Sequence, residues 1–72
     1  MYDLGARFKA VRTEKKLTQK QVALGIGVPE RQYQNYEYGK NTPSALILIA
    51  LADYLDVSLD YLVGRSDNPK RR

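Results

Sequence analysis

The sequence predicts an all-α domain built from five short helices that are joined by short loops. Apolar residues recur at helical spacing: Leu4, Phe8 and Val11 follow one another at i, i+4 and i+7. Residues that favour helix N-termini precede several such segments, and glycines follow them. Apolar–polar alternation typical of strands never extends beyond a few residues. With 72 residues the chain has room for one domain with a modest core.

The first two helices are expected over residues 4–16 and 18–25. Leu17 ends the first helix and points inward, after a segment whose other faces are basic. The second helix begins with Thr18-Gln19-Lys20-Gln21, which has the form of a capping box. Such a cap is typically worth about 1 kcal/mol. Gly25 is expected to end this helix, and residues 25–28 to form a tight turn.

Three further helices are predicted by their first and last residues. Pro29 opens the third, where its missing N–H costs nothing, and Gly39 ends it. Ser44, or Thr42 with Pro43, caps a fourth helix that runs to about residue 55, after a polar loop at 40–43. A short fifth helix spans 59–63. We therefore expect one domain over residues 1–66 and a flexible basic tail at 67–72.

Charge is unevenly distributed along the chain. The net charge is +4, yet residues 41–64 contain three Asp and no Lys or Arg, whereas residues 1–40 carry eight basic and four acidic side chains. One end of the domain is therefore basic, as expected where a single face meets a polyanion. Ordinary surface charge is the alternative.

The chain contains neither His nor Cys, which removes the commonest general base, the thiol nucleophile and the commonest metal ligands. We expect no enzymatic activity, no cofactor, no metal and no small-molecule ligand. The longest apolar run, at 45–52, is too short to span a bilayer, and the charged N-terminus is unlike a signal peptide. A cytoplasmic protein without a membrane partner is expected.

The predicted third helix has a polar outer face that suits nucleic acid. Arg31, Gln34, Asn35 and Tyr38 share one side of it, and Tyr33 and Tyr36 form its inner edge. Arg, Gln and Asn can make paired hydrogen bonds to base edges in the major groove, which admits one helix. The alternative is a merely solvated helix face.

A longer set of motifs extends this interpretation to the whole chain. In order, they are Leu4-Gly5-Ala6-Arg7, Val11-Arg12, Leu17-Thr18-Gln19, Val22-Ala23, Gly27-Val28, Tyr36-Glu37-Tyr38-Gly39-Lys40, Pro43-Ser44 and Val57-Ser58-Leu59-Asp60-Tyr61-Leu62-Val63-Gly64-Arg65. Their order and spacing resemble the Cro/cI-type (Xre-like) helix-turn-helix family over residues 3–66. The resemblance implies a compact five-helix, lambda-repressor-like fold and a sequence-specific regulator that binds double-stranded DNA.

The polar helix face and the resemblance together imply two sets of contact residues. Bases would be contacted by Glu30, Arg31, Gln32, Gln34 and Asn35. Phosphates would be contacted by Arg12, Thr18, Gln19, Tyr36, Tyr38, Lys40, Asn41 and Thr42. The resemblance also implies an internal salt bridge between Arg12 and Glu37. Three features depart from the family: Pro29 replaces a capping Ser or Thr, Glu30 places a negative charge near phosphates, and Tyr33 and Tyr36 replace an aliphatic residue and Trp.

The predicted fourth helix is apolar on nearly all sides, which a small monomer cannot bury. We expect Leu48, Leu51, Ala52 and Leu55 to face the core and the outer face to form a homodimer interface. That interface would contain Leu46, Ile47, Ala50, Tyr54 and Tyr61. The alternatives are a thicker core and scattered surface apolar residues.

These expectations combine into a repressor that binds a palindromic operator as a homodimer, with one recognition helix in each half-site. A protein-interaction module, such as an antitoxin or adaptor that uses the apolar face of the fourth helix, is the alternative.

Overall fold

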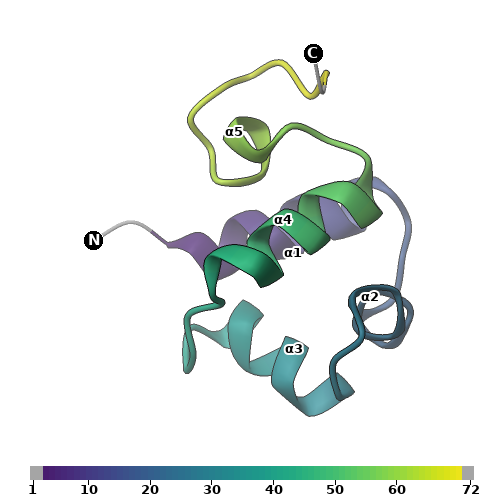
Figure 1. The fold of residues 1–72 in the computed structure, drawn as a ribbon. Coiled ribbons are helices and arrows are strands. Elements are labelled where there is room, and N and C mark those ends of the chain that lie inside the picture. Colours follow the sequence, from purple (N-terminus) through teal and green to yellow (C-terminus); the bar gives the residue numbers. More distant parts are fainter. Residues whose placement is uncertain (1–2, 71–72) are drawn as a thin grey trace.

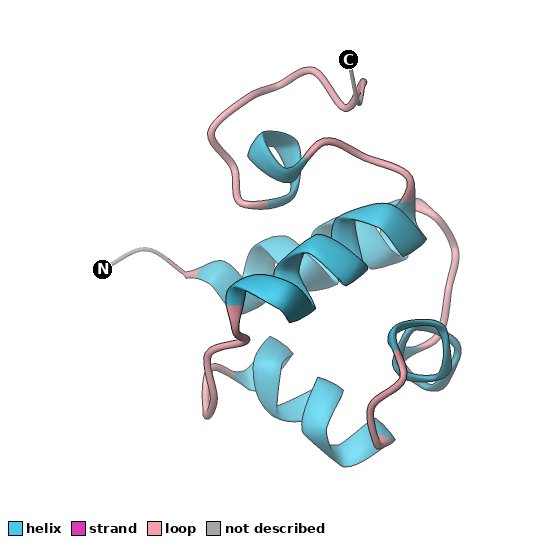
Figure 2. Ribbon diagram, viewed as in Figure 1, coloured by secondary structure: helices cyan, strands magenta, loops and turns pink. Residues whose placement is uncertain are grey.

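The computed structural model describes residues 3–70, which form five helices. These are α1 (Leu4–Glu14), α2 (Gln19–Ile26), α3 (Glu30–Tyr38), α4 (Ala45–Leu55) and α5 (Leu59–Leu62). In Figure 1, α4 lies in front of α1, α3 lies below them, and α5 and the C-terminal segment lie above. Figure 2 shows only helices and loops in the described part of the chain, so the all-α prediction is confirmed.

The core lies where the helices meet. Helix α1 packs against α3 and α5, and α2 packs against α3 and α4. The largest fully buried side chains come from every helix and from the α4–α5 loop: Phe8, Val11, Val22, Tyr33, Leu51, Leu55, Val57 and Leu62. Because each helix contributes to one core, the position of α3 depends on all the others.

The helix N-termini form largely as the sequence predicts. The Thr18 hydroxyl accepts from Gln21 N at 3.0 Å and Gln21 Oε1 accepts from Thr18 N at 2.8 Å, so the capping box is confirmed. Ser44, not Thr42, caps α4, and Ser58 caps α5. At α3, Pro29 is the N-cap residue itself and offers no side-chain acceptor.

The end of α2 differs from the prediction. Gly25 does not stop the helix, which continues to Ile26 and ends at Gly27 in the left-handed conformation, with φ 79°. Gly25 stays helical beneath the ring of Tyr54, where a Cβ atom would collide with that ring. Gly25 is therefore a packing residue, and Gly27 makes the turn into α3.

The segment predicted as a flexible basic tail begins at residue 67 and is described as far as residue 70. Over residues 67–70 it folds back over the start of α5: Ser58 N donates to Pro69 O at 3.0 Å, and Lys70 N donates to Asn68 Oδ1 at 3.0 Å. The rest of that prediction, residues 71–72, lies outside the described part. None of the helices between residues 3 and 70 is long and apolar enough to cross a bilayer.

Candidate nucleic-acid interface

Helices α2 and α3 are joined by a three-residue turn, 27–29, and cross steeply: in Figure 1, α2 is seen end-on while α3 runs along the lower edge. The predicted base-contacting residues divide by exposure along α3. Glu30 and Arg31 are exposed, and Gln32, Gln34 and Asn35 are half-buried. Tyr33, Tyr36 and Glu37 face the core. The polar side of α3 is thus presented at the surface.

A hollow beside α3 brings together residues from both predicted contact sets. Pro29, Arg31, Gln32, Asn35 and Tyr36 of the helix region line it with Asn41 and Thr42 of the following loop. The loop is fixed by α3 itself, because Asn35 O accepts from Lys40 N at 2.9 Å and from Asn41 N at 3.3 Å. Lys40, Asn41 and Thr42 remain exposed. Base-contacting and phosphate-contacting candidates therefore share one surface.

Glu37 is a buried carboxylate that connects three helices. Its Oε2 accepts from Arg12 Nε at 2.6 Å, and its Oε1 accepts from Arg12 Nη2 at 3.1 Å and from Gln19 Nε2 at 3.0 Å. The Glu37 side chain is 1% exposed. The salt bridge implied by the resemblance is therefore present, and it fixes α3 against the start of α2 and the end of α1.

Electrostatics in this cluster favour the charged pair. Burial alone would raise the pKa of Glu37, but the hydrogen bonds that it accepts, from Arg12 above all, hold that pKa below its ordinary value. The bond to Glu37 likewise raises the pKa of Arg12. Tyr33 buries its hydroxyl nearby without a hydrogen bond of ordinary geometry. Burial and then the neighbouring carboxylate raise the pKa of Tyr33, so this hydroxyl stays neutral.

The hydrogen bonds of this cluster reduce the number of N–H donors that Arg12 and Gln19 have left for a phosphate. Besides its two bonds to Glu37, Arg12 donates from Nη1 to Leu17 O at 2.8 Å. A guanidinium has five N–H donors, so only two remain for a phosphate. Gln19 keeps one amide N–H, and Thr18 uses its hydroxyl as the N-cap acceptor.

A hydrogen bond within α3 was not predicted from the sequence: Gln32 Nε2 donates to Tyr36 Oη at 2.6 Å.

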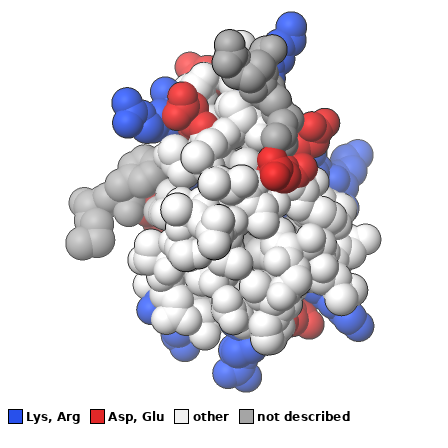
Figure 3. Space-filling model, in the orientation of Figure 1, with Lys and Arg blue, Asp and Glu red and all other residues white. Residues whose placement is uncertain are grey.

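The broad face over α4 is uncharged. In Figure 3, Lys and Arg side chains project around the edge of this face, along the lower rim, where α3 lies, and also at the upper left and the right. On α4 itself, Leu46 is 78% exposed and Ile49 is 48% exposed. Leu59 of α5, 42% exposed, lines a shallow hollow with Ile49.

The predicted dimer set is only partly at the surface. Leu46 and Tyr54 are exposed and Ala50 is half-buried, but Ile47 and Tyr61 pack against the core. The Tyr61 ring lies 5.2 Å from the Arg7 guanidinium carbon, and its hydroxyl donates to Glu14 at 2.9 Å. Ile47 is half-buried, as Ala50 is, and its place in the interface stays a prediction; Ile49, which was not predicted, is exposed on α4.

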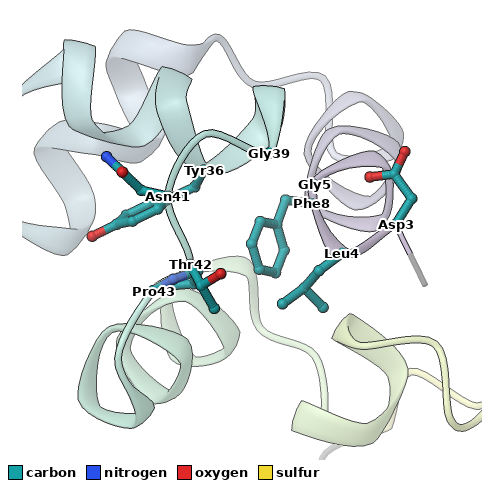
Figure 4. Close-up of a pocket in the computed structure, with 9 residues that line it drawn as sticks. All are labelled: Asp3, Leu4, Gly5, Phe8, Tyr36, Gly39, Asn41, Thr42 and Pro43. Atoms are coloured by element: carbon teal, nitrogen blue, oxygen red, sulfur yellow. The ribbon is translucent and has the colours of Figure 1, made fainter. Parts of the chain in front are cut away.

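A cavity of about 360 Å³ lies under the loop that follows α3. Figure 4 shows Leu4 and Phe8 pointing from α1 towards the loop segment that carries Thr42 and Pro43. The Tyr36 ring passes beside Asn41, with its hydroxyl on the side away from Phe8. Both apolar and polar side chains line the cavity, and no group of three or more potential metal ligands occurs among residues 3–70.

Comparison with known proteins agrees with this geometry. A helix-turn-helix family model matches residues 8–62. The uncharacterized HTH-type transcriptional regulator YqaE of Bacillus subtilis is 42% identical over 62 residues, which cover 86% of this chain and 53% of that protein. The chain thus spans about half the length of the curated relatives it matches.

Two solved structures resemble the whole domain. The restriction-modification controller protein C.AhdI from Aeromonas hydrophila superposes with a TM-score of 0.81 at 28% identity, covering 85% of this chain and 92% of that one. The P22 c2 repressor, solved in complex with a synthetic operator, gives a TM-score of 0.78 at 28% identity, covering 88% and 96%. The lambda-repressor-like fold predicted from the sequence is confirmed.

Proposed function

Because the chain belongs to the helix-turn-helix family, we propose that it is a sequence-specific regulator that binds double-stranded DNA and represses transcription. The observation that carries this proposal is the shared surface of α3 and the 40–42 loop, where Arg31, Gln32 and Asn35 adjoin Asn41 and Thr42. This arrangement suits a helix in the major groove with a loop on the adjacent backbone. Repression is supported by the likeness to the P22 c2 repressor.

Selection of bound duplexes from a random pool tests the proposal. We expect one enriched motif of two inverted half-sites about one helical turn apart. Affinity for that motif should fall linearly with the logarithm of salt concentration, because each neutralised phosphate releases counterions. A pool that remains random at low ionic strength would reject DNA recognition and favour the alternative, a protein-interaction module that uses the apolar face of α4. Without His or Cys, we propose no enzymatic role.

Two single substitutions separate base recognition from backbone attraction. Arg31→Ala should lose about 1–3 kcal/mol on the selected site and little on random duplex, because it removes a contact to a base edge. Lys40→Ala should weaken both alike and reduce the salt slope by about one, because it removes a phosphate contact. Each variant removes one positive charge, so each serves as the control for the other. Titrations at several salt concentrations measure both effects, and a uniform loss for Arg31→Ala contradicts its assignment.

We also propose that two copies associate through the exposed face of α4. Leu46, Ala50 and Tyr54 of the predicted set remain there, and Ile49 and Leu59 extend it towards α5. An apolar patch of this kind on a small domain is typical of an association surface. The proposal places this regulator in the cytoplasm as a homodimer on its operator.

The double substitution Leu46→Glu/Ile49→Glu should give a folded monomer. Both side chains are exposed, so the core is spared, while charge on the face prevents association. We expect operator affinity to fall at least tenfold, because each half-site must then be bound separately. Sedimentation and duplex titration measure the two effects. Leu24→Glu, which changes a 74% exposed leucine of α2, is the matched control for sedimentation. A parent protein that is monomeric at high concentration contradicts the proposed interface.

A further inference from the structure

Tyr36 connects the core to the base-contacting surface. The residue is 6% exposed, and its ring meets the Tyr33 ring edge-on at 6.5 Å between centroids. The ring contributes to the cavity wall with Phe8, and the hydroxyl lies on the side away from Phe8 (Figure 4). The same residue lines the hollow beside α3 with Arg31 and Asn35. A rigid aromatic ring thus carries a hydroxyl to the surface where base contacts are proposed.

The partner of that hydroxyl is a candidate base-contacting side chain. Gln32, one helical turn earlier, donates from Nε2 to Tyr36 Oη at 2.6 Å. Gln34 offers a comparison on the same helix: its amide reaches Glu30, an exposed and flexible partner, at 3.5 Å. Of these two glutamines, only Gln32 is held by a side chain that is itself fixed in the core.

The hydrogen bond to Tyr36 determines which donor and acceptor atoms of the Gln32 amide remain free to contact a base. A primary amide has two N–H donors and one oxygen acceptor. When the N–H that points away from Oε1 is given to Tyr36, the other N–H and Oε1 remain side by side. That donor–acceptor pair is complementary to adenine N7 and N6 in the major groove. The terminal torsion of a free glutamine is broad and roughly two-fold, so the amide could also turn over and exchange donor for acceptor.

We propose that Tyr36 is a positioning residue for base recognition: its hydroxyl holds Gln32 so that this glutamine recognises adenine. The inference rests on the proposed DNA-binding function and deepens it. Packing of the Tyr36 ring accounts for the aromatic residue but not for its hydroxyl, and the hydroxyl is bonded to Gln32 at the shared surface. This role replaces the phosphate contact predicted for Tyr36, so its hydroxyl acts on the DNA only through Gln32.

The test uses Tyr36→Phe, Gln32→Ala and the double variant on the motif selected by the parent protein. Affinities are measured for the motif, for its single base-pair variants and for random duplex. Tyr36→Phe should reduce the preference for adenine at one position in each half-site by about three- to tenfold, the range of one ordinary hydrogen bond. Binding to random duplex should not change. In the Gln32→Ala background the further change Tyr36→Phe should have no effect, because the side chain through which Tyr36 acts is gone.

Tyr38→Phe is the matched control, because it removes a hydroxyl from an exposed tyrosine of the same helix. It should leave every base preference unchanged. Thermal unfolding of each variant separates loss of folding from loss of recognition. The inference is overturned if Tyr36→Phe weakens all duplexes alike, changes no preference, or still acts without Gln32. It is also overturned if the affected position prefers guanine. A parent protein that selects no motif at all would instead reject DNA recognition, so the two failures are distinguishable.

Discussion

Glu37→Ala is expected to lower the free energy of unfolding by about 3–5 kcal/mol, the usual cost of breaking a buried ion pair from one side. Arg12, whose side chain is 11% exposed, would keep its charge while losing its salt-bridge partner. Gln19 would lose its acceptor as well. A small domain has little stability to spare, so most of the variant would be unfolded at moderate urea concentrations.

Urea melts of the parent and variant measure this loss. Glu14→Ala is the control, because Glu14 is an exposed carboxylate that also accepts a hydrogen bond, from Tyr61. It should cost less than about 1 kcal/mol. A second variant, Arg12→Met/Glu37→Met, removes both charges and should be more stable than Glu37→Ala. If Glu37→Ala costs no more than Glu14→Ala, the buried pair is not what fixes α3.

The stabilisation by the Arg12–Glu37 pair is expected to decrease as the pH falls. Because the folded protein holds the pKa of Glu37 below its ordinary value, the stabilisation is fully present above the unfolded pKa of about 4.3. It is lost as pH falls through the lower, folded value, where the carboxylate takes up a proton. The difference in stability between the parent and Glu37→Ala should therefore shrink over that acidic range. Arg12 stays charged throughout.

Local signals in the sequence were sufficient for the helices and for most of their caps. The Thr18 capping box lies within four residues, and both of its bonds form. The end of α2 was wrong because it depends on a distant residue, Tyr54, whose ring covers Gly25. The exposure of Ile49 was not predicted, because a helix that is apolar all round carries no period that shows which of its residues face out.

The contacts of the candidate site, like the helices, were only partly predicted from the sequence. The resemblance implied the pair of Arg12 and Glu37, although nothing local connects residues 25 positions apart. Sequence reasoning did not find the link from Gln19 to Glu37, which needs the packing of α2 on α3. The bond between Gln32 and Tyr36 had a local signal, the i, i+4 spacing on one helix. That signal was missed because Tyr36 was assigned only to the core and to a phosphate.

Gly5→Ala is expected to cost about 3 kcal/mol, at the upper end for overpacking. A Cβ atom on Gly5 would lie 2.7 Å from Tyr36 O and closer still to Glu37 O. Backbone oxygens inside α3 cannot turn away, so α1 would have to move off α3. The buried side chains of α1, Phe8 and Val11, would then lose contacts in the core. The gain in helix propensity, about 1 kcal/mol, offsets only part of this cost.

Gly25→Ala provides the matched comparison, because it is the same substitution in a helix whose obstacle is a side chain. The added Cβ would meet the ring of Tyr54, which is partly exposed and can move aside. The change should therefore cost far less than Gly5→Ala, and the propensity gain can make it nearly neutral. Urea melts of the two variants give the comparison directly. Equal losses would contradict the argument, because they would mean that the backbone of α3 yields as readily as an exposed ring. A selective loss at Gly5 means instead that the close crossing of α1 and α3 leaves no room for an added side-chain atom.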